Sequence, residues 1–358
     1  MEKVLKVGLT KQELIGQVLN ERYIITKHIG GGSFGDVFEA EDSVSESIVA
    51  LKFETGAAKN PQLQNEYLCY RILSKGTNIP RVYNIFDFKN SRVLAMEKMG
   101  PCLETLFRKA NKKFTLKTVC MIADQMIRTI EYVHNCGLVH RDIKPQNFLI
   151  GRGPLKSRIY LIDFGVSAHF IDVRTGEHIG HSSHNGLIGT AFYVSINTHL
   201  GDQQSRRDDL ESILYVLIRF MKGSLPWQVY KHKKADRNEK ITQSKLTTQL
   251  GDLCGGLPNE FRLVLDYIRH LRYDETPKYT WIRQQFKNVL AKNGFVYDGV
   301  FDWDEAAAIH PPLPSYYLIY SSIAFVRKNE RLIKGKKKPK VHLPEQRNIF
   351  LCALRNNY

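Results

Sequence analysis

Charged and polar residues stand between two apolar stretches in LVHRDIKPQNFLI, residues 138–150. Charged groups next to buried neighbours are costly unless they are paired or used. A plain polar turn would need neither the Arg nor the Lys that lie close to Asp142. A second acidic residue, Asp163, follows in LIDFG at 161–165, and Asn147 lies near the first. Such residues at the ends of a hairpin can bind Mg²⁺ and orient a hydroxyl group, which are the main demands of phosphoryl transfer.

A glycine-rich stretch, IGGGSFGDVF at 29–38, has the spacing G-x-G-x-x-G at Gly30, Gly32 and Gly35. The same spacing occurs in dinucleotide-binding folds, where it must open a helix. The strand-like DVFEAED that follows favours a β-hairpin instead. Backbone amides of such a hairpin can lie over nucleotide phosphates, where a Cβ would prevent close approach. An ordinary turn is the alternative.

Lys52 lies inside the apolar strand pattern ALKF, and a lysine in a core strand needs a counter-charge. Glu66 is the candidate, because its spacing places it on one helix face with Leu63 and Tyr70. A carboxylate on that inward face is explained if it directs Lys52 toward the phosphates of a nucleotide. A solvent-facing lysine on an edge strand is the alternative.

The elements that must position these residues change in type along the chain. Residues 22–53 contain three strand patterns rich in β-branched and aromatic residues. Thr115 can cap a helix with one apolar stripe, and Gly137 can end it. Residues 210–221, LESILYVLIRFM, are apolar nearly all round, as in a helix at the centre of a domain. A strand-rich part therefore precedes a larger helical part, with the junction near 100–101.

Composition limits the classes of partner and location. The 358 residues carry a formal net charge of +16, which favours anionic partners. No interleaving of basic and aromatic residues supports nucleic-acid binding. The longest apolar candidate, residues 316–326, is too short to span a membrane, and the N-terminus lacks the apolar core of a signal peptide. The six cysteines form no C-x-x-C pair, so reduced thiols in the cytoplasm or the nucleus are expected.

In order and spacing, these motifs resemble the protein-kinase signature set. The resemblance implies an α+β, two-lobed protein kinase fold, with ATP and Mg²⁺ between a β-rich N-lobe and a mainly helical C-lobe. Asp142 resembles the catalytic base, Lys144 the residue that steadies the transferring phosphate, and Met96 the gatekeeper before the adenine hinge. The implied site comprises the catalytic residues Lys52, Glu66, Asp142 and Lys144; the metal ligands Asn147 and Asp163; the ATP-binding residues Gly30, Gly32, Ser33, Phe34, Gly35, Val37, Ala50, Lys52, Met96, Glu97, Met99 and Leu149; and the substrate-segment residues Thr190 and Tyr193.

Later segments are similar to the casein kinase 1 family. Where kinases normally carry A-P-E, this chain has SINTHLGDQQSRRDDLES at 195–212, and GSLPWQ and GFVYDGVFDW follow. Lys144 and Thr190 resemble serine/threonine rather than tyrosine kinases. The resemblance implies an enzyme that transfers the γ-phosphoryl of Mg-ATP to Ser or Thr of proteins. The net charge favours acidic substrates, and among the possible oligomeric states a monomer is favoured. A pseudokinase scaffold is the alternative, but the phosphate-binding lysine and both aspartates are present.

The same resemblance implies a division of the chain. Residues 1–21 form an N-terminal extension, 22–305 the kinase domain and 306–358 a C-terminal extension; the N-lobe is expected at about 22–100 and the C-lobe at about 101–305. The basic run KGKKKPK at 334–340 is expected to be a solvated tail. Asp209 is implied to begin the buried helix and to bind the backbone of the His-Arg-Asp turn.

The substrate side departs from the family. Casein kinase 1 enzymes share basic residues that bind a phosphate already present on the substrate. At the corresponding positions this chain has Ala168, Ser182 and Phe192, with histidines nearby in VSAH and HSSH. We therefore expect an altered substrate anion site. Other basic residues, which follow GSLPWQ, are candidates to replace the missing charge: Lys231, Lys233, Lys234 and Arg237.

Overall fold

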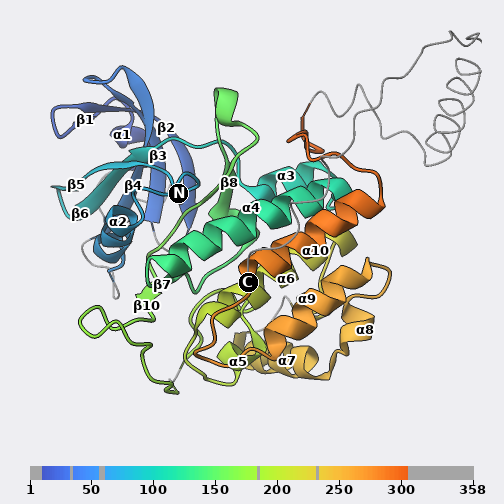
Figure 1. Cartoon of the computed structure of the whole chain (residues 1–358). Coiled ribbons are helices and arrows are strands. Elements are labelled where there is room, and N and C mark those ends of the chain that lie inside the picture. The colour runs from blue at the N-terminus through green and yellow to red at the C-terminus, as the bar shows by residue number, and fades with distance from the viewer. Residues whose placement is uncertain (1–9, 33–34, 56–60, 184–185, 231–233, 305–358) are drawn as a thin grey trace, which may run out of the picture. The chain divides into compact units, whose positions relative to one another are not determined.

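The computed structural model describes residues 10–32, 35–55, 61–183, 186–230 and 234–304, which belong to one compact unit, residues 1–307 (Figure 1). Ser33 and Phe34 of the glycine-rich stretch lie outside the described residues, as does the C-terminal extension with its basic run. The predicted domain limits at 22 and 305 stay predictions.

Strands dominate the first lobe, where six of them form one antiparallel sheet in the order β1-β2-β3-β4-β6-β5. Two small sheets, β7 with β10 and β8 with β9, lie beyond it in the chain. The strands are β1 Val18–Leu19, β2 Tyr23–Gly32, β3 Gly35–Asp42, β4 Ser47–Thr55, β5 Val82–Phe88, β6 Ser91–Glu97, β7 Leu138–Val139, β8 Phe148–Ile150, β9 Ile159–Leu161 and β10 Ala168–His169.

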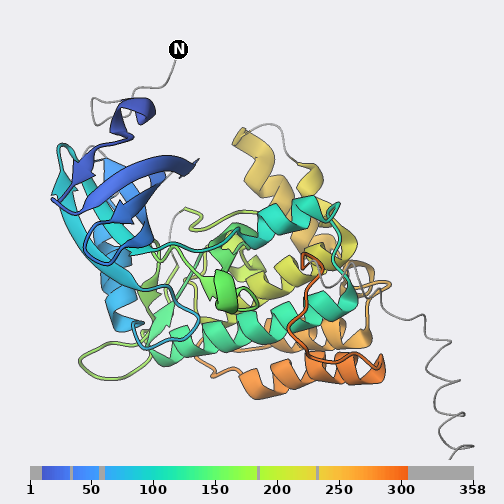
Figure 2. The same cartoon turned by 90° about the horizontal axis from the view of Figure 1, so that it is seen from above.

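Helices dominate the second lobe. Figures 1 and 2 show the strands of the large sheet gathered on one side with α1 and α2 beside them, and the later helices gathered on the other side. The α-helices are α1 Lys11–Leu14, α2 Leu63–Ile72, α3 Leu103–Lys109, α4 Leu116–Asn135, α5 Ile196–His199, α6 Arg206–Lys222, α7 Lys234–Thr247, α8 Leu250–Leu253, α9 Asn259–Arg269 and α10 Tyr279–Lys292; the 3₁₀ helices are η1 Pro145–Asn147, η2 Gly153–Leu155 and η3 Pro226–Val229. This arrangement confirms the two-lobed α+β prediction.

The glycine-rich stretch forms the hairpin between β2 and β3. Gly30 lies opposite Val37, and Gly32 lies opposite Gly35, in an antiparallel register. The stretch opens no helix, so the dinucleotide-binding alternative is wrong. Apolar side chains of the sheet, such as Phe38, pack into a separate core within this lobe.

Helix α4 begins and ends where the sequence predicted. Thr115 is its N-cap, and the Thr115 hydroxyl accepts a hydrogen bond from the backbone N–H of Thr118. The helix ends at Asn135, and Gly137 follows with a φ of +79°. Because that left-handed conformation is strained for other residues, glycine is well suited to this helix end.

Helix α6 begins at Arg206, not at residue 210 and not at Asp209. The backbone N–H of Ser205 donates to the Asp208 carboxylate at 2.7 Å, which satisfies a group at the helix start. The charged residues before 210 hid this start from a search for apolar periodicity. Burial raises the pKa of Asp208 to about 6, although Ser195 donates a hydrogen bond to its carboxylate.

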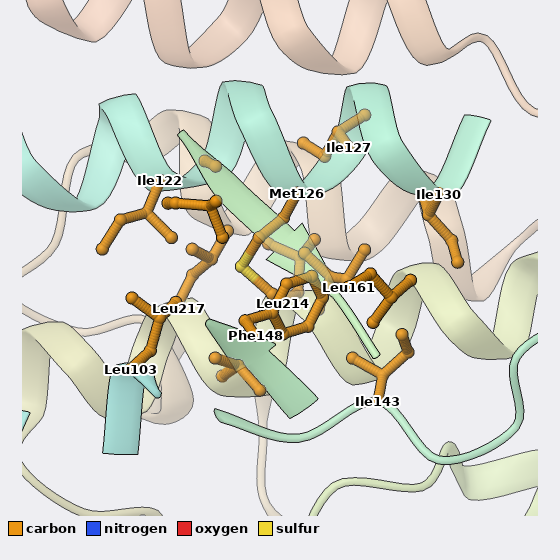
Figure 3. Packing of buried hydrophobic residues seen from close by; sticks show 14 of the residues in the cluster. Leu103, Ile122, Met126, Ile127, Ile130, Ile143, Phe148, Leu161, Leu214 and Leu217 are labelled. Carbon is orange, nitrogen blue, oxygen red and sulfur yellow. The ribbon is translucent and has the colours of Figure 1, made fainter. Parts of the chain in front are cut away.

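The main core lies between α4, α6 and the β8–β9 hairpin. In Figure 3, Met126 of α4 and Leu214 of α6 approach Phe148 of β8, and all three side chains are fully buried. Burial of such a side chain contributes about 1.5–3 kcal/mol. Ile143 and Leu161 belong to the same core. Ile143 directly follows Asp142, and Leu161 lies two residues before Asp163. This core therefore positions the backbone that carries both aspartates.

Candidate active site

Lys52 contacts two carboxylates that come from different parts of the chain. Its Nζ lies 2.6 Å from Glu66 Oε2 and 2.7 Å from Asp163 Oδ1. The strand β4 carries the lysine, the buried face of α2 carries Glu66, and Asp163 follows β9. The structure thus brings Lys52 and Glu66 together as their spacing predicted, and Lys52 is not a solvent-facing edge lysine.

Burial and neighbouring charge compete at these three groups. Burial raises the pKa of Glu66 to about 7, because the charge of Lys52 offsets only part of the cost and Asp163 adds a like charge. Burial lowers the pKa of Lys52, but the two carboxylates outweigh it and keep that pKa well above its usual value. Burial likewise disfavours ionised Asp163, but Lys52 brings its pKa below the usual value. Lys52 and Asp163 are therefore both charged at neutral pH.

The His-Arg-Asp turn rests on Asp209 of α6. The Asp209 carboxylate accepts the backbone N–H of His140 at 2.7 Å and that of Arg141 at 2.9 Å. His134 Nε2 lies 3.0 Å from the same carboxylate. Arg141 has a φ of +69°, a conformation that costs roughly 1–3 kcal/mol in a residue other than glycine. The contact implied for Asp209 is present, and it stabilises a strained turn.

Asp142 lies at the end of that turn and is buried. Its Oδ2 accepts from Lys144 Nζ at 2.6 Å, and its Oδ1 accepts from Thr190 Oγ1 at 2.7 Å. Asn147 donates its side-chain amide to the Asp142 carbonyl at 2.9 Å. One carboxylate oxygen is thus already placed to accept a hydrogen bond from an alcohol.

The Asp-Phe-Gly segment is positioned by α2. The backbone N–H of Asp163 donates to the Tyr70 hydroxyl at 3.1 Å, and Asn65 donates to the carbonyls of Gly165 and Ser167 at 3.1 and 3.2 Å. Asp163 has a φ of +71°, again in the left-handed region. One helix therefore orients both carboxylates that contact Lys52.

These residues surround a cavity of about 900 Å³, within the usual size range of small-molecule sites. Asp142 itself does not line the cavity, but Lys144 and Thr190, which bond to its carboxylate, do. Tyr193 does not line it in this structure, and Ser33 and Phe34 lie outside the described residues. The predicted residues that line it are Gly30, Gly35, Val37, Ala50, Lys52, Glu66, Met96, Glu97, Met99, Lys144, Asn147, Leu149, Asp163 and Thr190.

Two glycines of the hairpin serve different purposes. A Cβ on Gly30 would meet no atom within 4 Å, so the space over this part of the hairpin is open. A Cβ on Gly35 would lie 1.8 Å from the Phe53 carbonyl oxygen, and Gly35 has a φ of +140°. Gly35 is therefore required by the fold itself, whereas Gly30 leaves room for a ligand.

Other lining residues were not predicted. Ile29 and Ile162 also line the cavity, and each directly precedes a motif. Their apolar character beside polar motif residues could have indicated them. Cys102 and Arg152 line it as well, as does Lys98 of the predicted hinge, residues 97–99. No local pattern marked Cys102 or Arg152, because only the approach of the two lobes brings them to the cavity.

On the substrate side, a cation comes from α7. The Arg237 guanidinium lies over the Phe192 ring, 5.0 Å from its centroid. Ser182 donates its hydroxyl to Gln203 at 2.6 Å. His181 Nε2 lies 3.4 Å from an Asp202 carboxylate oxygen. Of the other candidate cations, Lys231 and Lys233 lie outside the described residues, as does the Lys234 side chain.

A glycine-rich hairpin over a cavity, a lysine between two carboxylates and a second aspartate beside a lysine define the site of a protein kinase-like phosphotransferase. The family model for the protein kinase domain matches residues 23–270. Because the match covers more than half of the 358 residues, the chain belongs to the protein kinase family. Membership implies ATP as the phosphoryl donor and proteins as substrates.

Three further observations bear on metal, membrane and redox chemistry. Among the described residues, no group of three or more His, Cys, Asp or Glu side chains could bind a metal ion by itself. Nor does this part of the chain contain a helix long and apolar enough to cross a membrane. The described cysteines, Cys69, Cys102, Cys120, Cys136 and Cys254, are free thiols.

Proposed function

We propose that this protein is an active serine/threonine kinase, similar to casein kinase 1, that transfers the γ-phosphoryl of Mg-ATP to Ser or Thr of protein substrates. The supporting observation is that Lys52 and its two carboxylate partners line one cavity. Lys144 and Thr190, which both donate hydrogen bonds to the Asp142 carboxylate, line the same cavity. Phosphoryl transfer is mainly a matter of positioning and of neutralising charge, so such an arrangement suits it.

The donor atoms fit Mg²⁺. Kinase magnesium sites use one or two carboxylates or amides together with substrate phosphates, so a complete cage of protein ligands is not needed. Asp163 and Asn147 line the same cavity. Since the Asn147 amide nitrogen binds the Asp142 carbonyl, its oxygen is the atom left for a cation. When bound, the ion would neutralise charge on the transferring group.

Each remaining role belongs to a residue of the chain. Lys52 presents a positive charge to the phosphates, and Glu66 keeps its side chain in place. The β2–β3 hairpin covers the nucleotide from above. Asp142 accepts the proton of the substrate hydroxyl, and Lys144, bonded to the same carboxylate, lies beside the transferred group. Only an aligned hydroxyl reacts, because the reacting atoms must lie about 3–3.5 Å apart.

Two features support Ser or Thr as acceptors and an acidic substrate. The Thr190 hydroxyl already donates to Asp142, so an aliphatic alcohol fits beside this carboxylate. The net charge of +16 favours acidic protein segments.

The test is transfer of labelled phosphate from ATP to a library of Ser, Thr and Tyr peptides by purified protein. We expect phosphoserine and phosphothreonine, and loss of both in Asp142→Asn. A protein that binds ATP but labels no peptide would be a pseudokinase, and labelling of Tyr alone would contradict the acceptor assignment.

A further inference from the structure

Lys245 of α7 is an unusually buried cation, with 1% of its surface exposed. Its Nζ donates to two backbone carbonyls, that of Ala191 at 3.0 Å and that of Val194 at 2.5 Å. The same ammonium lies 4.9 Å from the ring centroid of Tyr215 and 5.2 Å from that of Trp227. It therefore bonds to the main chain of the substrate segment and to aromatic faces.

A buried ammonium is costly, so its retention calls for an explanation. Burial lowers the pKa of Lys245 well below its usual value. Two charged groups also act on this pKa: Glu211 of α6 raises it, and Arg269 of α9 lowers it. Glu211 is itself bonded to the Tyr215 hydroxyl and lies 3.4 Å from Arg269. The lysine thus satisfies carbonyl groups more directly than it balances a charge.

Those carbonyls belong to one short turn. The Thr190 carbonyl accepts the backbone N–H groups of Tyr193 at 2.8 Å and Val194 at 3.1 Å. Thr190 also donates its hydroxyl to Asp142. Lys245 thus contacts the residue directly after Thr190 and the residue that closes the turn, so its position determines where Thr190 lies.

Two more donors reach the same turn from the second lobe. The indole N–H of Trp227 donates to the Phe192 carbonyl at 2.8 Å. His199 Nε2 lies 3.1 Å from the Ala191 carbonyl, and its Nδ1 lies 2.9 Å from Thr242 Oγ1. The carbonyls of the turn are thus bonded from outside, by side chains that are distant from it in the sequence or follow it.

We infer that Lys245 is a positioning residue for the protein substrate: by binding the carbonyls of Ala191 and Val194, it places the 190–194 turn against Asp142. The inference rests on the proposed function for the identity of the acceptor. It concerns peptide binding and alignment rather than the nucleotide.

The experiment compares Lys245→Met, which keeps the length of the side chain but removes its hydrogen-bond donors, with Lys240→Met, which removes an exposed lysine from the same helix. Peptide kcat/KM is measured per nucleotide-binding site, so unfolded protein does not count. We expect Lys245→Met to lose about tenfold or more, mostly through a higher peptide KM, because two hydrogen bonds to the turn are lost. The ATP Kd should stay at the wild-type value. Lys240→Met should match the wild type in both.

Hydrogen exchange gives a second measurement that needs no substrate. Backbone amides of Tyr193 and Val194 should exchange at least about tenfold faster in Lys245→Met, while those of β8 keep their rates. If Lys245→Met does not fold, Thr242→Val, which removes the hydroxyl next to His199, should raise the peptide KM about two- to fivefold. Wild-type kcat/KM per site and unchanged exchange at the turn would overturn the inference. An inactive wild-type protein would instead refute the proposed function, and the exchange rates would still decide the role of Lys245.

Discussion

The nucleotide side and the substrate side of the cavity are built differently. Around the phosphate position, Lys52 has 14% of its side chain exposed and Glu66 only 2%, and they lie 2.6 Å apart. On the substrate side, the His181 side chain is 47% exposed and lies 3.4 Å from Asp202. The first side is thus buried and closely paired, whereas the second is exposed and loosely paired.

The difference follows from what each side must do. A buried ion pair loses much of its value if one partner is removed, because the other charge is left without compensation. The phosphate side therefore tolerates few residue types. An exposed pair is worth about 0–1 kcal/mol, so residues there can change with little effect on the fold. Substrate preference can thus vary while the chemistry is kept.

The largest effect is expected on the nucleotide side, from Asp163→Asn. This change removes a proposed metal ligand and a partner of Lys52, so phosphoryl transfer should fall by at least about 10³-fold, since the ion supplies several kcal/mol. Circular dichroism and thermal melting should show a folded protein. The control is Asp87→Asn, on a carboxylate that is 70% exposed, and it should keep full activity. Wild-type turnover in Asp163→Asn would refute the assignment.

Glu66→Gln tests the same side more gently. A glutamine can still accept a hydrogen bond from Lys52 but carries no charge, so above the raised pKa of Glu66, at about pH 8, kcat/KM for ATP should fall about 10- to 100-fold. Steady-state kinetics with varied ATP measure the change. Glu41→Gln, at an exposed position in β3, should behave as the wild type. Equal losses in both variants would mean that the ion pair is not specifically required.

A pH effect is expected on the substrate side, at His199. Burial and then the charge of Lys245 lower the pKa of His199 to about 4, below its ordinary value of 6.5. As the pH falls, His199 is therefore protonated in the unfolded chain before it is protonated in the folded protein. The stability that is present above pH 6.5 is lost as the pH falls toward 4. The free energy of unfolding in urea should fall by about 1–2 kcal/mol more across this interval than it does in His199→Gln.

The control for this experiment is His270→Gln, because the His270 side chain is 79% exposed. Between pH 6.5 and pH 4, the free energy of unfolding of His270→Gln should fall by as much as that of the wild type. Identical pH profiles for the wild type and His199→Gln would contradict the assignment of a buried neutral histidine.

A smaller effect concerns peptides that already carry a phosphate before the acceptor. Ala168 and Ser182 stand where the proposed similarity to casein kinase 1 implies basic residues, so the ratio of kcat/KM with and without that phosphate should stay below about threefold. A strong preference for the phosphorylated peptide would contradict this, and its loss in Arg237→Met would identify the cation.

The smallest effect is expected on treatment with phosphatase. Arg141 pairs with an activation-loop phosphate in many kinases, but here its Nε donates to the Val166 carbonyl at 2.6 Å. Bacterially expressed protein should therefore keep its activity within about a factor of two after dephosphorylation. Activity that appears only after phosphorylation of Ser182 or Thr190 would show that the substrate side must be ordered first.

Local sequence signals predicted much of the fold. The Thr115 cap, the Gly137 helix end and the β2–β3 hairpin depend on neighbouring residues, so their patterns were readable. The start of α6 was missed because the Ser205 and Asp208 pairing replaced the apolar signal with charges. The cavity-lining residues Cys102 and Arg152 had no local signal at all.

The sequence alone determined the type of chemistry, because the spacing around Asp142 and Asp163 is short and each motif is contained in a few residues. Only the tertiary structure decided which distant groups complete the site. Thr190 reaches Asp142 across 48 residues, and Lys245 reaches Ala191 across 54. A lysine in an amphipathic helix is normally exposed, although the spacing of Lys245 from Ile241 places it on the buried face of α7. Whether such a charge is buried depends on which carbonyls and aromatic rings pack around it, and that is a property of the fold.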